Sequence, residues 1–253
     1  MSTTAIIVAV VAGALAIVNT VYTARLQLRL EQQRAERTKR EVVEDLMARY
    51  REPLLRASFD FQSRLYNIVE QSFLDVYYLG DRPDARIYAR DNTLYVVAEY
   101  LGWVEIIRRE VRFLDLGDEQ TNRIWAQRLD RVRLVLLTDR HAGVLQLFNG
   151  QQRAIGELMT RSVETPTANS PRLECMGYAE FVARQQDPDF AQWFARLRDD
   201  VDLLAHEPQR FQGRVIELQH ALIDLIDVLD PGHQRLPEQQ RRRLGPREGQ
   251  TPA

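Results

Sequence analysis

The sequence predicts an all-α protein: an N-terminal transmembrane helix that continues into a stalk, followed by a multi-helix cytoplasmic domain. Three observations predict this fold class. An uncharged apolar run occupies the N-terminus, and a densely charged stretch without Gly or Pro follows it. Beyond them, apolar residues recur at the three- and four-residue spacing that is typical of helices with one buried face.

The apolar run extends from Thr3 to Ala24 and carries no charged side chain. About 20 residues of helix are enough to cover the ~30 Å hydrocarbon core of a bilayer. A buried helix of a soluble domain would show a polar face, and this run shows none before Asn19. A cleaved signal peptide needs a basic start, whereas here Arg25 follows the run and no basic residue precedes it. We therefore assign residues 1–24 as a transmembrane anchor that is not cleaved.

The charges that flank the run predict its orientation. The residues that precede it include no Lys or Arg, whereas the following segment contains Arg25, Arg29, Arg34, Arg37, Lys39 and Arg40. Basic residues close to a span stay on the cytoplasmic side. We expect a single-pass protein of the inner (plasma) membrane with its N-terminus outside and its domain in the cytoplasm. A single cysteine, Cys175, fits a reducing compartment, and the preference for Arg over Lys is typical of GC-rich bacterial genomes.

Two surfaces of this N-terminal region have candidate roles. Small and polar residues share one face of the anchor, which lets two helices approach closely: Ala9, Ala12, Ala16 and Asn19. We expect self-association there; the alternative is that Ala is simply common and Asn19 is hydrated. The six basic residues can lie against anionic headgroups, each contributing about 1 kcal/mol. The alternative for them is a solvated helix held by local Glu–Arg pairs.

The remaining chain divides into a charged helical stalk (25–50), a helical globular domain (51–231) and a disordered tail (232–253). The loop 162–172, rich in Ser, Thr and Pro, either separates two helical subdomains or is exposed within one. Within the domain the periodicity predicts helices over 53–80, 92–117, 118–140, 178–186, 189–207 and 211–229.

Local signals set the ends of these helices. Pro53 is expected to begin a helix that Gly80 ends, and Pro231-Gly232 is expected to stop the last one. Asp187 and Pro188 predict a cap and a first turn. Around Asn149-Gly150 we expect a helix–turn–helix connection, with a β-hairpin turn as the alternative. The segment 92–117 is apolar on most of its circumference, which predicts a central helix.

The sequence carries no recognisable catalytic or metal-binding motif. The four histidines lie far apart, no cysteines are paired, and no glycine-rich phosphate loop is present. We expect no metal and no cofactor, favour a role without catalysis, and assign no catalytic residue. The net charge of −2 argues against a nucleic-acid partner.

One charged cluster is a candidate site for a polar ligand or partner. It lies on the predicted central helix and comprises Glu99, Glu105, Arg108, Arg109, Glu110 and Arg112. Charges that emerge from an apolar helix need partners, which a ligand could supply. We favour the alternative, a solvated face stabilised by intrahelical pairs such as Glu105–Arg109.

A second charged cluster needs compensation. Asp224, Asp227 and Asp230 lie near the C-terminal end of the last helix, where negative charge opposes the helix dipole. We expect arginines of the core or of the tail, Arg241–Arg243, to pair with them. The alternative is a bound cation or a basic partner.

Together these features predict a membrane-tethered cytoplasmic interaction or sensor module. Its expected partners are the lipid bilayer, a second copy of the chain and an unidentified protein. Two alternatives remain: a membrane-disrupting or pore-forming effector assembled through the anchor, and an enzyme that acts at the membrane surface. The enzyme hypothesis requires a pocket in which Glu99 or Glu110 meets Arg partners.

Overall fold

The computed structural model describes residues 3–110, 119–140, 143–164 and 172–245. Within these ranges, side chains are described for residues 19, 22, 23, 25–35, 37, 38, 49–110, 123–140, 143–164 and 172–245. The chain divides into two compact units, Met1–Met47 and Ala48–Ala253, which we describe separately. The described residues are mostly helical, with one small two-stranded sheet, so the predicted helical class is confirmed.

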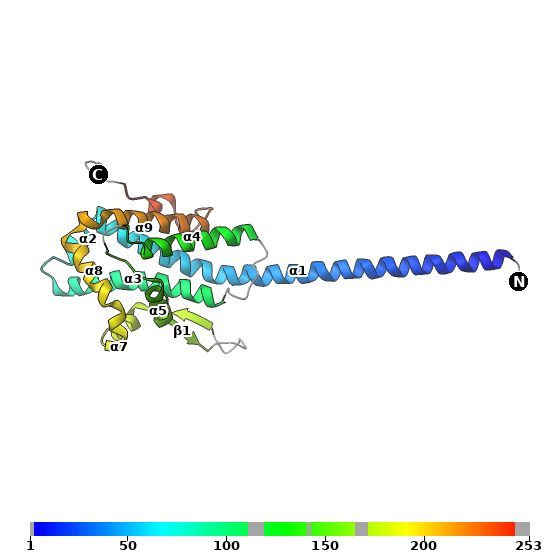
Figure 1. Cartoon of the computed structure of the whole chain (residues 1–253), viewed down its shortest axis with the longest axis horizontal. Coiled ribbons are helices and arrows are strands. Elements are labelled where there is room, and N and C mark those ends of the chain that lie inside the picture. The colour runs from blue at the N-terminus through cyan, green and yellow to red at the C-terminus, as the bar shows by residue number, and fades with distance from the viewer. Residues whose placement is uncertain (1–2, 111–118, 141–142, 165–171, 246–253) are drawn as a thin grey trace. The chain divides into compact units, whose positions relative to one another are not determined.

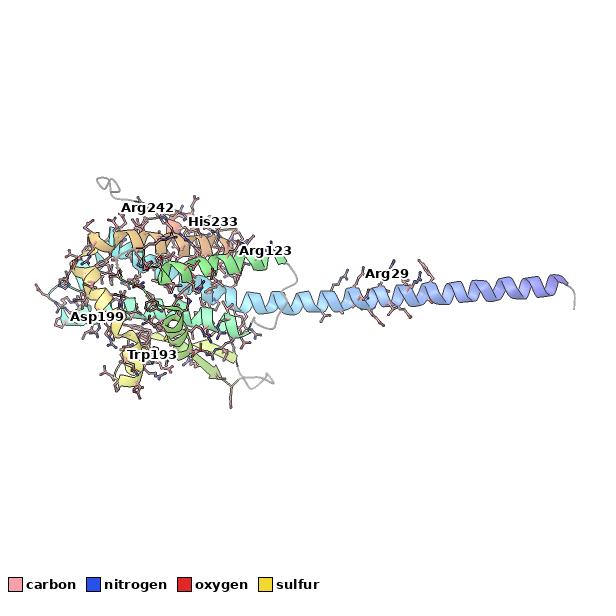
Figure 2. The ribbon with its side chains drawn as sticks, in the orientation of Figure 1. Arg29, Arg123, Trp193, Asp199, His233 and Arg242 are labelled. Carbon is pink, nitrogen blue, oxygen red and sulfur yellow. The ribbon has the colours of Figure 1, made fainter. Side chains whose placement is uncertain are left out.

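The first unit belongs to helix α1 (Thr3–Glu70), so the helix predicted for residues 25–50 is confirmed. Arg29, labelled in Figure 2, is exposed on it. Of the helices in the described part of the chain, none is both long enough and apolar enough to cross a membrane. The predicted anchor falls on residues 3–24, where only Asn19, Tyr22 and Thr23 have described side chains.

The prediction that Pro53 begins a new helix is wrong, because α1 passes through it. A proline inside a helix costs about 3 kcal/mol. Burial on both sides of Pro53 offsets that cost, since Tyr50, Leu54 and Leu55 are all in the core. The helix also ends earlier than Gly80: Ser72 adopts a left-handed conformation (φ 50°), and the short helix α2 (Phe73–Tyr77) follows it.

The second unit is a helical bundle whose main elements are α1, α3 (Pro83–Glu110), α4 (Glu119–Leu137) and α9 (Pro208–Leu229). Within it α4 packs along α9, and the end of α1 lies between that pair and α3 (Figure 1). Gln62 of α1 accepts a hydrogen bond from Gln219 of α9 at 3.1 Å. Phe61 of α1 packs against Tyr100 of α3 with tilted rings, their centroids 5.9 Å apart. The part of α1 around Phe61 and Gln62 therefore contacts both α3 and α9.

The smaller elements cover one side of α3. They are α5 (Asn149–Met159), β1 (Thr160–Val163), β2 (Arg172–Cys175), α6 (Tyr178–Arg184), α7 (Pro188–Ala191), η2 (Gln192–Phe194) and α8 (Ala195–His206). Segment 83–110 contacts α2, α5, α6, α8 and both strands, so the predicted central helix is confirmed. Asp187 caps α7 by accepting from the Asp189 amide at 3.0 Å, as predicted.

The structure tests the predictions for Asn149-Gly150 and for the loop 162–172. Asn149-Gly150 begins α5, so the helix–turn–helix connection is confirmed and the hairpin alternative at that dipeptide is wrong. The loop expected over 162–172 is wrong at both ends. Val163 pairs with Arg172 and Thr160 with Cys175 in an antiparallel ladder. Four-residue strands are too short to display an alternating pattern, and residues 165–171 lie outside the description.

Two glycines allow α3 and α5 to approach closely. A Cβ placed on Gly156 would lie 2.7 Å from the Leu101 carbonyl oxygen and 2.8 Å from the Glu105 Cβ. A Cβ on Gly102 would lie 2.9 Å from the Met159 Cβ of α5 and 2.6 Å from the Cys175 Sγ of β2. Real Cβ atoms do not approach other atoms so closely, so each position accepts only glycine without movement of its neighbours.

The disorder expected from residue 232 onward is wrong as far as Gly245, where the description ends. A 3-10 helix, η3 (Glu238–Arg241), places Arg241 in the interior, 6% exposed, and Leu244 is also buried. The Leu244 amide donates to the Gln219 side chain at 3.2 Å, and His220 Nε2 lies 2.7 Å from the Leu244 carbonyl oxygen. His233 and Arg242 of this segment lie on the same side of the domain in Figure 2.

Arginines compensate the three aspartates at the end of α9, as predicted. Arg241 donates to Asp227 at 3.0 Å and to Asp230 at 2.5 Å. Arg243 donates to Asp224 at 2.6 Å. The pairing explains why a tail with a disordered composition is ordered. The buried Arg241 guanidinium needs its carboxylates, which lie in the last turn of α9 and directly after it.

Candidate functional site

A polar pocket of about 300 Å³ lies between α1 and α3. We call it the α1–α3 pocket. Its lining residues come from successive turns of the two helices and are nearly all polar: Asp60, Ser63, Arg64, Asn67, Tyr88, Asn92, Tyr95, Val96 and Glu99. Elsewhere the facing sides of α1 and α3 pack through apolar side chains such as Phe61 and Tyr100, so this polar strip is where they are not packed together.

Arg64 is the most deeply buried charge in the pocket lining, 9% exposed. Its Nη2 donates to the Asn92 side chain, and its guanidinium lies over the Phe73 ring, 3.8 Å from the centroid. Among the described residues, its Nε and Nη1 atoms have no hydrogen-bond partner. Burial lowers the pKa of Arg64 from its ordinary value. A buried donor without an acceptor costs about 1–3 kcal/mol, more for a charged group. Arg64 therefore lowers the stability of the folded state.

Two carboxyl groups line the same pocket. Burial, followed by repulsion from Asp60, raises the pKa of Glu99 to about 7. Burial raises the pKa of Asp60 as well, although Arg56 and Arg64 oppose the rise. Such shifts are common where titratable groups converge on a functional site.

Neighbouring groups extend the shielded environment of Glu99. The Tyr95 hydroxyl donates a hydrogen bond to the Met176 carbonyl oxygen at 3.3 Å and also bonds Glu99. Burial, and then the charge of Glu99, raises the pKa of Tyr95. Burial, and then Glu99, raises the pKa of the Cys175 thiol to about 12. The thiol is therefore protonated at neutral pH.

The charges of the pocket are separated along its length. Asp60 and Arg64 are one helical turn apart on α1, a rise of about 6 Å. On α3, Asn92 lies beside Arg64, whereas Glu99 is two turns further along and interacts with Asp60. The pocket therefore has a cationic end at Arg64 and an anionic end at Asp60 and Glu99.

The structure separates the residues of the predicted ligand cluster. Of the members of this cluster that the structure describes, only Glu99 lines the α1–α3 pocket. Glu105 is 3% exposed and accepts from Arg108 and Arg109 at 2.6–2.7 Å. Burial alone would raise the pKa of Glu105, but its two arginines outweigh that effect and hold it below the ordinary value. Glu110 ends α3, and Arg112 lies outside the described residues.

The predicted residues of the N-terminal unit are only partly described. The side chains of Asn19, Arg25, Arg29, Arg34 and Arg37 are exposed. The side chains of Ala9, Ala12, Ala16, Lys39 and Arg40 lie outside the described set. The self-association face and the basic membrane surface therefore stay predictions.

Asp60 and Arg64 are the site residues that sequence reasoning missed. Opposite charges four residues apart on a helix resemble an exposed intrahelical pair. A usable signal was present, because Arg64 stands between Phe61 and Leu65, two members of the apolar stripe of the same helix. A charge on the buried face of a helix indicates a site or a buried pair.

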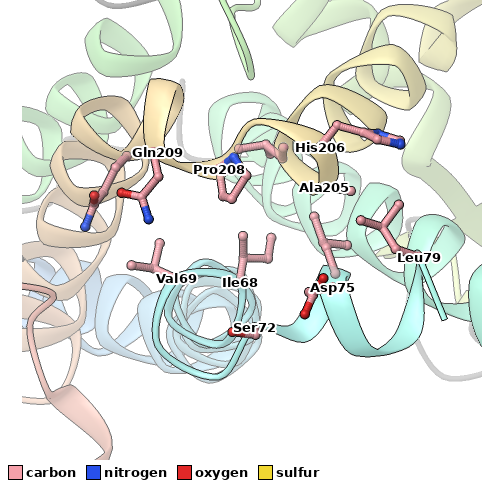
Figure 3. Close-up of a pocket in the computed structure, with 12 residues that line it drawn as sticks. Ile68, Val69, Ser72, Asp75, Leu79, Ala205, His206, Pro208 and Gln209 are labelled. Carbon is pink, nitrogen blue, oxygen red and sulfur yellow. The ribbon is translucent and has the colours of Figure 1, made fainter.

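A second cavity of about 330 Å³ lies where the end of α1 meets the α8–α9 junction. Figure 3 shows Ile68 and Val69 of α1 on one side of it and Pro208 on the other. Its ionisable residues, Asp75 and His206, are both exposed. Since it gathers no buried charge, it is the weaker candidate for binding a charged ligand.

Neither a metal site nor a known relative adds to the functional assignment. In the part of the chain that the structure describes, no group of three or more His, Cys, Asp or Glu could hold a metal ion. Comparison of the chain with protein-family models, with curated proteins and with solved structures finds no match.

Lowering the pH from 8 to 6 is expected to stabilise the protein. The raised pKa of Glu99, about 7 instead of 4.5, means that the folded state binds its proton more tightly than the unfolded state does. Ionisation therefore costs stability, fully above pH 7 and progressively less down to about pH 4.5. Glu99→Gln should remove most of this dependence and raise the free energy of unfolding at pH 8 by on the order of 2 kcal/mol.

Urea unfolding of the full chain in mild detergent, followed by tryptophan fluorescence, measures this effect. Asp200, whose pKa burial raises to about 6, adds a smaller dependence of the same sign in the lower part of this range. Glu105→Gln is the matched control, because its carboxylate is stabilised by arginines and its loss should lower stability at pH 8. A Glu99→Gln profile as steep as that of the wild type would contradict the assignment.

Proposed function

We propose that the chain is a membrane-tethered cytoplasmic sensor module whose helical domain binds a small polar ligand in the α1–α3 pocket. The observation that carries the proposal is Arg64, a buried charge with two unpaired donors at the wall of a pocket that also holds Asp60 and Glu99. Such a group does not stabilise the fold by itself, whereas a ligand that accepts its hydrogen bonds would stabilise it.

The membrane part of the proposal rests on the sequence. The uncharged run from Thr3 to Ala24 and the basic flank after it favour an anchor with the domain in the cytoplasm. The run and the residues Asp60 and Arg64 belong to one continuous helix, α1. Contact with a second copy through Ala9, Ala12, Ala16 and Asn19, and with an unidentified protein, remains part of this proposal.

A tag after Ala253 tests the membrane part. In intact cells the tag should resist added protease, and in inverted membrane vesicles it should be cleaved. The protein should remain with the membrane in alkaline carbonate, and a variant without residues 3–24 should not. A tag cleaved from outside intact cells would overturn the proposed orientation.

Replacing Arg64 by methionine tests the pocket part. If Arg64 is kept for binding, Arg64→Met should raise the free energy of unfolding of the ligand-free full chain by about 1–2 kcal/mol. Methionine preserves the contact with Phe73 and removes the buried, half-paired charge. Urea unfolding in detergent measures the difference.

Arg241→Met is the matched control for Arg64→Met. Arg241 is buried to a similar degree but is fully paired, so its replacement should destabilise the protein by leaving Asp230 without its cation. Loss of stability in both variants would indicate that Arg64 is structural and would sink the proposed binding role.

The same pocket supports a second candidate, an enzyme at the membrane surface. Glu99, with a pKa of about 7, suits general-base chemistry near neutral pH. Ligand turnover by the wild type that Glu99→Gln abolishes even at a ligand concentration that saturates the variant would favour the enzyme over the sensor.

A further inference from the structure

The charge layout of the α1–α3 pocket narrows the class of ligand, and this step rests on the proposed function. A simple anion would suit Arg64 but would meet repulsion from Asp60 and Glu99. A simple cation would suit the carboxylates but would leave the Nε and Nη1 donors of Arg64 unpaired. A molecule with both charges satisfies both ends.

We propose that the pocket binds a small zwitterion of the amino-acid class, with its carboxylate on the Arg64 guanidinium and its ammonium group between Asp60 and Glu99. A planar guanidinium offers paired donors that match a carboxylate. The ammonium group places a positive charge beside two acids that repel each other, in addition to the partial compensation that Arg56 and Arg64 give Asp60.

The dimensions of the pocket agree with this class. One helical turn separates Asp60 from Arg64, about 6 Å along the axis. Two hydrogen bonds and the backbone of an amino acid can bridge that separation, and about 300 Å³ leaves room for a polar side chain beside Ser63 and Asn67. The Nε and Nη1 atoms of Arg64 are screened from solvent, so binding includes a turn of the guanidinium toward the ligand.

Ligand binding should stabilise the folded state at both ends of the α1–α3 pocket. Ligand binding supplies the missing acceptors of Arg64 and a counter-charge for Glu99. It should therefore raise the melting midpoint of the protein, by on the order of 5 °C at 100 times the dissociation constant.

The test is thermal unfolding of the full chain in mild detergent at pH 8, read by tryptophan fluorescence. The probes are the twenty L-amino acids, β-alanine and 4-aminobutyrate. Each probe that raises the midpoint is compared with its carboxylate lacking the amine and its amine lacking the carboxylate. The alanine set, L-alanine, propionate and ethylamine, is measured in every case.

At least one zwitterion should raise the midpoint, and neither of its single-charge analogues should do so. Arg64→Met should weaken binding at least 100-fold, and Asp60→Asn and Glu99→Gln about 10-fold each. Arg153→Gln, which removes an exposed arginine on α5 outside the pocket, should bind like the wild type. Binding that survives in Arg64→Met would overturn the assignment.

The remaining outcomes separate this inference from the proposed function. If propionate or another simple carboxylate binds as tightly as its amino acid, the zwitterion is wrong and the pocket is an anion site, which the proposed function allows. If no probe shifts the midpoint, the amino-acid class is overturned, while the Arg64→Met stability test decides on the pocket itself.

Discussion

Replacing Asp230 by alanine is expected to lower the free energy of unfolding by about 3–5 kcal/mol, because it leaves a buried cation unpaired. Asp230 is 5% exposed and joins the end of α9 to the C-terminal segment. Its carboxylate accepts from the amides of Gln234, Arg235 and Leu236 at 3.0–3.1 Å and from Arg241 at 2.5 Å. Alanine removes all four bonds at once.

The titration behaviour of Asp230 agrees with this role. Burial by itself would raise the pKa of its carboxyl group, but the three amides and Arg241 outweigh that effect and hold the pKa below its ordinary value. Its contribution to stability is therefore present above about pH 4 and is lost as the pH falls through the lowered value. Asp230→Ala should be most destabilising at neutral pH.

Urea unfolding of the full chain in detergent measures the loss, and limited proteolysis should show faster cleavage after residue 233. Asp224→Ala is the control, because Asp224 is partly exposed and pairs at the surface with Arg128 and Arg243. Its loss should cost less than about 1 kcal/mol. Equal effects of the two substitutions would contradict a special role for Asp230.

Replacing Gly156 by leucine is expected to cost about 3 kcal/mol, because overpacking at a rigid contact forces backbone movement. The first atom of any side chain would lie 2.7 Å from the Leu101 carbonyl oxygen and 2.8 Å from the Glu105 Cβ. Neither atom belongs to a flexible side-chain end, so α3 and α5 must separate. Separation would also expose the buried Glu105 carboxylate, which lies beside this contact.

Gly150→Ala is the control within the same helix. A Cβ at Gly150 meets no atom within 4 Å, so alanine should be neutral or stabilising by up to about 1 kcal/mol. Thermal unfolding of both variants shows whether the loss of stability comes from the contact at Gly156 or from any substitution of a glycine in α5. A Gly156→Leu variant as stable as the wild type would show that the two helices are not held at this distance.

The elements that sequence reasoning predicted best have strong local signals. The last helix repeats apolar residues every three or four positions from Phe211 to Leu229, and Pro231-Gly232 stops it, so both its existence and its end are confirmed. Pro53 also gave a strong local signal, but burial of its neighbours overrode it. The strands around residues 160–175 gave no signal, because each has only four residues.

The C-terminal segment shows how composition and pairing can disagree. Few apolar residues after His233 predicted disorder, whereas the aspartates of α9 predicted that Arg241 would be needed there. The pairing argument was correct. Applied to the tail, it would have predicted an ordered chain as far as Arg241. Pairing over a distance of 11–14 residues cannot be read from composition.

The candidate site was predictable only in part. Glu99 stood out as an acid on a mostly apolar helix, and the structure places it in a pocket. Its companions, Asp60 and Arg64, lie about 35–40 positions earlier in the sequence, and only the antiparallel packing of α1 on α3 brings them together. Glu105, Arg108 and Arg109 satisfy one another, which is why the cluster as a whole is not a site.

The shielded thiol of Cys175 has a practical consequence for spectroscopy. Its pKa of about 12 leaves almost no thiolate at neutral pH, so maleimides and methanethiosulfonates should modify it slowly. A cysteine introduced at an exposed position of the helical domain, such as Val76, should react much faster. The unaltered chain can therefore serve as the background for spin labels or fluorophores without first removing its own sulfhydryl.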